Sequence, residues 1–160
     1  MWSSRLVLPV LLLALTGCGF QLRGAVTVPP QMQQTYIDTA NRHSPFYRAL
    51  RRELATAGVD VVDDPQAASA VFRVISDETG QRVLSVSARN VPREFEVFYT
   101  IFYAVDTGEE ALLEPRTQTL TRDYTWDETL VLGKEKEEAL LREAIADDLV
   151  RIVVIQLSSI

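Results

Sequence analysis

The sequence contains very few residues of the two types that most often build metal sites. Among its 160 residues there is one cysteine, Cys18, and one histidine, His43. A single cysteine excludes a disulfide within the chain, and together these two residues are too few for a His/Cys metal cluster. We therefore expect no metal site and no cofactor.

Positive charge and long hydrophobic runs are scarce as well. The 16 Lys and Arg residues against 22 Asp and Glu residues leave a net charge of −6. This argues against a general nucleic-acid-binding protein, because such proteins contact phosphates through a basic surface. The longest apolar run, at 6–15, has ten residues, whereas a helix needs about 20 to cross a bilayer. The remaining composition is that of an ordinary globular protein, and the length fits one domain.

The N-terminus has the pattern of a bacterial secretion signal. Arg5 supplies a positive charge, the apolar run follows, and the stretch ends in Leu15-Thr16-Gly17-Cys18. A charged segment, a short apolar segment and small residues before the cleaved bond are typical of signal peptides. The cysteine directly after them makes this stretch resemble a lipobox. We interpret residues 1–17 as a lipoprotein signal peptide and Cys18 as the lipidated N-terminus; the alternative is a buried free cysteine after a signal without lipidation.

The rest of the chain alternates between strand and helix patterns. Residues 18–33 contain Pro29-Pro30 and show no helical period, which indicates a tether. A short β-like run at 35–39 is followed by a helix with an N-cap hydroxyl at Ser44, a proline at its first position and Gly58 at its C-terminal end. The pattern then turns to β from 70 to 126. A last helix is expected at 135–157.

The clearest strand is the segment FEVFYTIFYAV at 95–105. Its alternate residues Phe95, Val97, Tyr99, Ile101, Tyr103 and Val105 share one face. Phe98 and Phe102 lie on the other face, so we expect that face to contact something too. We also expect a turn or bulge around 77–80. The order β-α-β-β-β-α predicts an α+β fold for a single domain at 34–160: a two-layer sandwich with a four-stranded mixed sheet and two helices packed on one face.

Enzymatic hypotheses find little support in the sequence. His43 and Ser44 could suggest a base and a nucleophile, but adjacent side chains rarely reach the same substrate atom, and no G-x-S-x-G motif follows. The paired carboxylates, such as Asp63-Asp64 and Asp147-Asp148, are typical of solvated surface charge. A phosphate-binding glycine loop is absent as well. We expect a protein that is not an enzyme.

The N-terminal motif continues in a more specific way. The stretch from Leu15 to Gly24 reads LTGCGFQLRG. It resembles the LPS-assembly lipoprotein (LptE) family, in which the lipobox is followed by glycine, an aromatic residue, a polar residue and Leu-Arg. The resemblance extends over the mature chain, through the proline-started helix containing Arg48-Ala49-Leu50-Arg51, the central hairpin and the C-terminal helix.

This resemblance implies a non-enzymatic component of lipopolysaccharide transport. Members of the family occupy the lumen of the LptD β-barrel in a one-to-one complex, help that barrel to assemble and bind lipopolysaccharide. Cys18 would then carry a thioether-linked diacylglycerol and an amide-linked acyl chain. Gly19, rather than Asp, implies sorting to the periplasmic side of the outer membrane.

The resemblance also singles out two cations. Family members carry basic residues in the loop between the central strands and ahead of the last helix, and the matching positions are Arg89 and Lys134. A guanidinium or an ammonium suits the phosphates of lipopolysaccharide, although each of these residues could also be a solvated surface charge. Two other functional classes stay open, namely a pilotin-like periplasmic adaptor for another outer-membrane protein and a periplasmic hydrolase.

Overall fold

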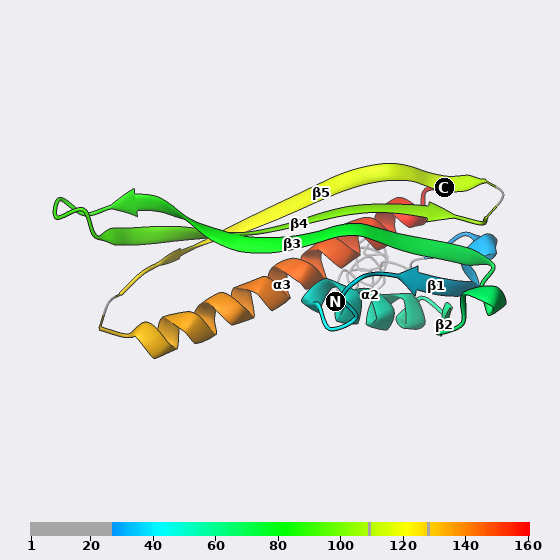
Figure 1. The fold of residues 1–160 in the computed structure, drawn as a ribbon, viewed down its shortest axis with the longest axis horizontal. Helices are drawn as coiled ribbons and strands as arrows, with labels where there is room; N and C mark the ends of the chain where they lie inside the picture. Colours follow the sequence, from blue (N-terminus) through cyan, green and yellow to red (C-terminus); the bar gives the residue numbers. More distant parts are fainter. Residues whose placement is uncertain (1–26, 109, 128) are drawn as a thin grey trace, which may run out of the picture.

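The structure is a computed structural model that describes residues 27–108, 110–127 and 129–160. The predicted signal peptide, the predicted lipobox and Cys18 lie outside the described residues. Figure 1 shows an elongated molecule with a long twisted sheet above two helices. The elements in order are η1 (Pro30–Met32), β1 (Gln34–Asp38), α2 (Pro45–Thr56), β2 (Asp60–Val62), η2 (Pro65–Ala67), β3 (Ala70–Val86), β4 (Pro92–Asp106), β5 (Ala111–Thr125) and α3 (Val131–Leu157).

The strands form one mixed sheet in the order β2-β1-β3-β4-β5. β1 pairs in parallel with β2 and with β3, and β3, β4 and β5 are antiparallel neighbours. Both helices lie on the same face of the sheet, so the predicted two-layer α+β architecture is confirmed. The sheet has five strands rather than four. The additional strand, β2, has only three residues, too few to show an alternating pattern, and its place beside β1 is set by the return of the chain from α2.

The start of α2 satisfies its backbone donors in the way that Ser44-Pro45 predicts. Pro45 has no N–H, the N–H of Tyr47 donates to Ser44 Oγ at 3.1 Å, and the N–H of Arg48 donates to the Ser44 carbonyl at 3.2 Å. The remaining free donor, the N–H of Phe46, bonds the hydroxyl of Tyr99 on β4 at 3.3 Å. At the other end, Gly58 has the positive φ of +85° expected of a helix-ending glycine.

The core lies between the two helices and the middle of the sheet. The predicted inward face of β4 is confirmed, since Val97, Tyr99, Ile101, Tyr103 and Val105 are all fully buried and Phe95 is partly buried. Phe72 of β3 stacks on Tyr103 with 5.4 Å between the ring centroids. Met32, which the sequence pattern placed in the tether, is also fully buried in this core.

β3 is one continuous strand, so the turn or bulge expected around 77–80 is wrong. The register shifts of this strand lie on either side of that segment: one between Val74 and Ser76, where Ile75 is the additional residue, and two between Val83 and Val86. Gly80 has another role: it lies opposite Phe98, and a Cβ at this position would be 2.7 Å from Phe98 Cζ. The glycine therefore accommodates an aromatic ring on the sheet face away from the helices and does not mark a turn.

α3 has two unlike halves. It begins at Val131, earlier than the predicted 135, because no capping side chain marks its start: its N-cap residue is Leu130, which forms no side-chain cap. All residues of α3 are described, and the buried ones run from Ile145 to Leu157, with none before Ile145. The second half thus belongs to the core, and the first half covers a thinner part of the molecule. In the described part of the chain, no helix is both long and apolar enough to cross a bilayer.

Candidate functional site

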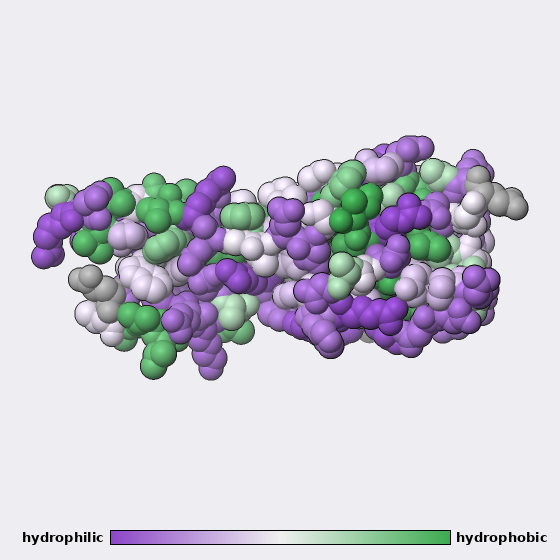
Figure 2. Space-filling model, in the orientation of Figure 1, coloured by the Kyte–Doolittle hydropathy of each residue, from purple (hydrophilic) through white to green (hydrophobic). Residues whose placement is uncertain are grey.

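Among the residues that the structure describes, most of the exposed large hydrophobic side chains lie at the narrow end of the molecule. We define the tip as this end, made of the β3–β4 turn, the adjoining strand ends and the start of α3 (Figure 1). Figure 2 shows apolar and charged side chains interspersed there. The exposed large apolar residues of the tip are Val83, Leu84, Val86, Val91, Leu130, Val131 and Leu132.

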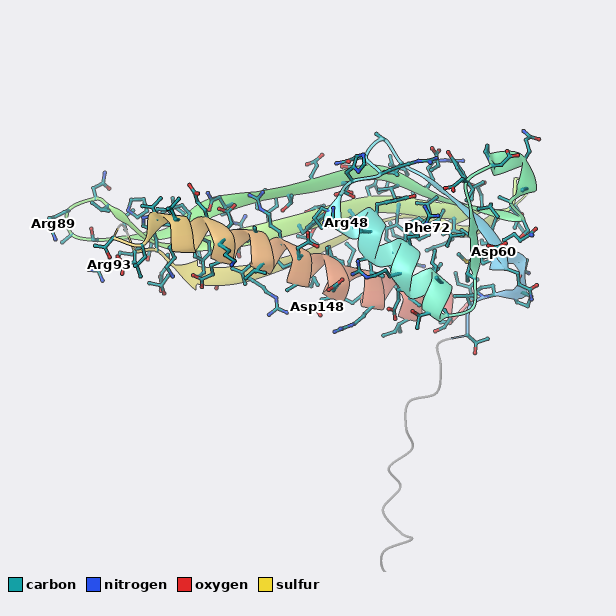
Figure 3. All side chains as sticks on the ribbon, turned by 90° about the horizontal axis from the view of Figure 1, so that it is seen from below. Arg48, Asp60, Phe72, Arg89, Arg93 and Asp148 are labelled. Carbon is teal, nitrogen blue, oxygen red and sulfur yellow. The ribbon has the colours of Figure 1, made fainter. Side chains whose placement is uncertain are left out.

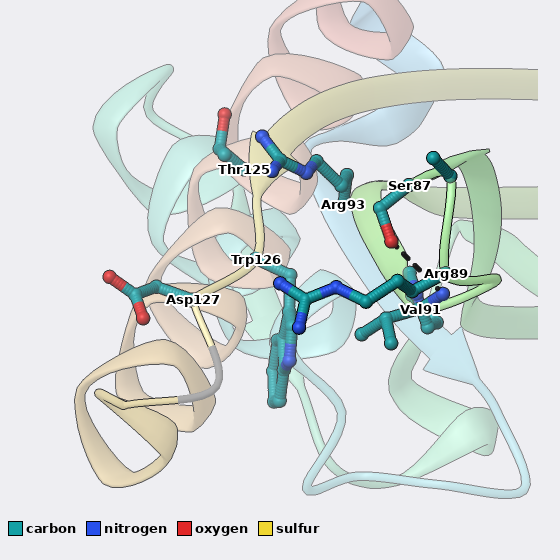
Figure 4. Close-up of a pocket in the computed structure, with 9 residues that line it drawn as sticks. Ser87, Arg89, Val91, Arg93, Thr125, Trp126 and Asp127 are labelled. Atoms are coloured by element: carbon teal, nitrogen blue, oxygen red, sulfur yellow. Dashed lines mark hydrogen bonds between the residues drawn. The ribbon is translucent and has the colours of Figure 1, made fainter.

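The tip contains an open cavity of about 660 Å³ between the β3–β4 turn and the segment that follows β5 (Figure 4). It is lined by Ser87, Ala88, Arg89, Val91, Pro92, Arg93, Thr125, Trp126 and Asp127. Figure 3 shows that Arg89 and Arg93 lie at the same end of the molecule, far from Arg48 on α2. Two guanidinium groups and an indole therefore share one concave surface.

Backbone hydrogen bonds hold the two walls of this cavity in place. In the turn, the N–H of Asn90 donates to the Ser87 carbonyl at 2.9 Å and the N–H of Ser87 donates to the Val91 carbonyl at 2.8 Å. Asn90 has a φ of +61°, a left-handed conformation that asparagine tolerates better than most residues. Across the cavity, the N–H of Trp126 donates to the Arg93 carbonyl at 2.7 Å. The positions of Arg89, Arg93 and Trp126 thus follow from well-bonded backbone.

The charge of the cavity wall is mainly positive. None of the ion pairs between described residues includes Arg89 or Arg93. One carboxylate, Asp127, lies at the rim, and it accepts hydrogen bonds from the hydroxyl of Thr129 at 2.7 Å and from its N–H at 2.9 Å. These two bonds lower the pKa of Asp127. The Asp127 carboxylate is thus held by Thr129 and does not neutralise the arginines by direct contact.

Lys134 is placed differently from the expectation. It lies in the first turn of α3 and not in a loop, and its side chain is only 17% exposed. Its ammonium pairs with Glu137 at 2.7 Å and lies 6.0 Å from the centroid of the Tyr124 ring. The glycine before it, Gly133, suggests a loop by propensity, but the helix includes it. Lys134 is therefore a partly covered, paired cation.

An aromatic cluster joins the two predicted cations. Phe95 stacks on Tyr124 at 5.7 Å and meets Trp126 edge-on at 5.5 Å. Trp126 forms a wall of the cavity that contains Arg89, whereas Lys134 lies over Tyr124 at the other side of the cluster. The structure thus brings Arg89 and Lys134 to the same end of the molecule but not into one cavity.

The sequence analysis missed Arg93 and Trp126 as site residues. Trp126 was included only as the end of the β pattern at 70–126, and Arg93 lies within that pattern without a motif of its own. The sequence does show a second arginine four positions after Arg89. It does not show the tight turn between them, which brings both arginines to the same end of the hairpin.

The candidate hydrolase pair has a structural role. The Ser44 side chain caps α2 and is almost fully buried, and the carbonyl of His43 accepts a hydrogen bond from Arg48. The arginines of α2 pair with carboxylates: Arg48 with Glu143, Arg52 with Asp147, and Arg51 with Asp63. Among the residues that the structure describes, no group of three His, Cys, Asp or Glu side chains could hold a metal ion.

Comparison with known proteins gives one consistent result. The family model described as "LptE: Lipopolysaccharide-assembly" matches residues 32–157. The chain is 30% identical over 152 residues to the LPS-assembly lipoprotein LptE of Pectobacterium atrosepticum, covering 91% of this chain and 82% of that protein. It is 28% identical over 144 residues to the LptE of Yersinia enterocolitica, covering 89% of this chain and 69% of that protein.

Solved structures agree with the sequence matches. The solution structure of lipoprotein B from Nitrosomonas europaea aligns with a TM-score of 0.71 at 28% identity, covering 88% of this chain and 91% of that one. The rare lipoprotein B from Shewanella oneidensis aligns with a TM-score of 0.67 at 25% identity, covering 79% of this chain and 94% of that one. The two-layer fold described above is thus shared with other bacterial lipoproteins.

Proposed function

The chain belongs to the LptE lipopolysaccharide-assembly family, and on this premise we propose that it is an outer-membrane lipoprotein that assists assembly of the LptD β-barrel, occupies its lumen and binds lipopolysaccharide in transit. In this proposal the protein catalyses no reaction. Cys18 carries the diacylglycerol and the N-acyl chain, and the folded domain lies on the periplasmic side of the membrane. Several acyl chains together anchor a protein stably, whereas one chain holds it only marginally.

The observation that carries lipopolysaccharide binding is the composition of the tip. Cationic side chains lie there beside exposed aliphatic ones, which is the complement of a ligand with phosphates and acyl chains on the same molecule. Because the net charge is −6, the field of the whole protein repels an anion at long range. Binding must then come from local cations, for which we propose Arg89 in the cavity and Lys134 beside it in α3.

Association with the barrel is tested by co-purification. We expect the protein with Cys18→Ala to purify one to one with LptD, because the specificity of the contact lies in the folded domain and not in the acyl chains. Depletion should leave LptD misassembled and lipopolysaccharide retained beneath the cell surface. Recovery of a different outer-membrane protein instead of LptD would favour the pilotin-like adaptor, and normal LptD with normal surface lipopolysaccharide after depletion would contradict the proposal.

Binding of lipopolysaccharide is tested with one charge reversal. Arg89→Asp should weaken binding to lipopolysaccharide in detergent micelles while the protein still associates with LptD, since an exposed turn residue contributes little to folding. We exclude Lys134→Asp from this test, because Lys134 is paired with Glu137 and its reversal would also disturb α3. Unchanged affinity in Arg89→Asp would exclude Arg89 from the binding site.

A further inference from the structure

The cavity at the tip contains a second arginine that neither the sequence pattern nor the family resemblance singles out. Arg93 is the second residue of β4, and its side chain reaches the same concave surface as that of Arg89 (Figure 4). Its backbone is fixed by the bond between its carbonyl and the N–H of Trp126 at 2.7 Å. Arg89 in the β3–β4 turn and Arg93 at the start of β4 thus line one cavity together with Trp126.

Lys134 cannot take the place of Arg93 in this cavity. It is not among the residues that line the cavity, and its ammonium is already compensated by Glu137 at 2.7 Å. Arg93, by contrast, is exposed and forms no ion pair with any carboxylate that the structure describes. A planar guanidinium can also bond a phosphate through two parallel N–H groups, which an ammonium cannot do.

We propose that this cavity binds one phosphate monoester, clamped between Arg89 and Arg93 and bordered by Trp126, as the headgroup subsite of an acylated glycolipid. The inference rests on the proposed function and deepens it by naming the second cation and the group it binds. Val91, 37% exposed, lines the cavity, and Val86, 52% exposed, directly precedes its lining residue Ser87. They give the apolar part of the ligand a surface, which a free phosphate ion would not use.

The test measures the affinity of the full-length lipoprotein in detergent for three probes: lipopolysaccharide, the same lipopolysaccharide after removal of its phosphates, and inorganic phosphate. Arg93→Gln and Arg89→Gln should each weaken binding of lipopolysaccharide by about tenfold, the effect of losing one charge-assisted hydrogen bond. The two effects should not be additive, because both arginines hold the same group. The matched control is Arg116→Gln, an exposed arginine of β5 that pairs in register with Tyr103, in the other half of the sheet.

The outcomes distinguish failure of this inference from failure of the proposed function. Dephosphorylated lipopolysaccharide should bind to the wild type and to Arg93→Gln equally, and Arg116→Gln should bind like the wild type. Normal affinity of Arg93→Gln for intact lipopolysaccharide would overturn the two-arginine site and leave the family function untouched. Inorganic phosphate binding as tightly as lipopolysaccharide would overturn the glycolipid source, and a wild type that binds no lipopolysaccharide would remove both proposals. Unchanged melting temperatures of the variants keep the comparison free of folding effects.

Discussion

The hydroxyl of Tyr99 joins the sheet to the start of α2, and its removal should cost more than the loss of an ordinary buried hydroxyl. It donates to Asp77 Oδ1 at 2.6 Å and accepts the N–H of Phe46 at 3.3 Å. The other oxygen of the Asp77 carboxylate is buried and has no partner among the described residues. Tyr99→Phe therefore leaves a partly buried carboxylate and one helix donor without their partner, while the ring itself still fills the core.

The expected loss follows from the charge of the acceptor. Hydrogen bonds to charged groups contribute about 1.5–3 kcal/mol, against about 0.5–1.5 kcal/mol for neutral pairs. We expect Tyr99→Phe to lower the free energy of unfolding by about 2–3 kcal/mol and the melting temperature by roughly 6–10 °C for a domain of this size. The matched control is Tyr103→Phe, on the same strand and face, whose hydroxyl donates to the neutral side-chain oxygen of Gln156.

The measurement is urea and thermal unfolding followed by circular dichroism. Tyr103→Phe should cost about 1 kcal/mol, so the reasoning is refuted if Tyr99→Phe costs no more than this control. A second comparison, Asp77→Asn alone and combined with Tyr99→Phe, isolates the coupling between the two side chains. A coupling near zero would show that the hydroxyl and the carboxylate do not stabilise one another.

The same hydroxyl predicts a pH dependence. Burial, and next the hydrogen bond to Asp77, raise the pKa of Tyr99 above its ordinary value of 10.0. A group whose pKa is raised by folding contributes stability that is complete below its unfolded pKa and is lost as the pH rises through the folded value. The wild type should therefore lose stability above pH 10, and Tyr99→Phe should lose less. A smaller loss should persist in this variant, because burial also raises the pKa of Tyr103 and of Tyr124.

Three further outcomes are expected. Cys18→Ala should abolish acyl labelling and leave an unprocessed or soluble periplasmic species, whereas acyl-labelled protein in the outer membrane would contradict the lipobox interpretation. Ser44→Ala should destabilise the domain by about 1 kcal/mol through loss of the α2 cap, with Ser44→Thr as the control that keeps a hydroxyl; loss of a hydrolytic activity in Ser44→Ala would revive the hydrolase hypothesis. Lys134→Gln should weaken lipopolysaccharide binding less than Arg89→Gln does, because the ammonium is already paired with Glu137; equal losses would contradict this difference between the two cations.

The parts of the fold that the sequence predicted are those set by local chemistry. Ser44-Pro45 and Gly58 mark the two ends of α2 through a cap hydroxyl, a missing N–H and a left-handed residue, each of which acts within one turn of chain. The alternation from Phe95 to Val105 predicted the buried face of β4 because side chains in a strand point to opposite sides of the sheet.

The parts that failed depend on distant neighbours. Gly80 was interpreted as part of a turn. Its actual role is to leave space for the ring of Phe98, which lies on the neighbouring strand and is 18 positions away in the sequence. β2 was missed because its three residues form a strand only by pairing with β1. The cavity at the tip has the same origin: Arg89 and Arg93 become neighbours of Trp126 only when β4 and the end of β5 are paired, a contact between residues more than 30 positions apart. Such contacts leave no periodic pattern in the sequence.

The unequal burial along α3 implies that the protein unfolds in stages. From Ile145 onward the helix is held by the core, so its amide protons should exchange with solvent only when the whole domain unfolds. The first half is held by ion pairs, such as Lys134 with Glu137 and Glu138 with Arg142, and by partial contacts with the aromatic cluster. Its amides should exchange through a local opening of much lower free energy. Within α3, a ligand bound at the tip should slow exchange in the first half only, because the amides of the second half already exchange only through unfolding of the whole domain.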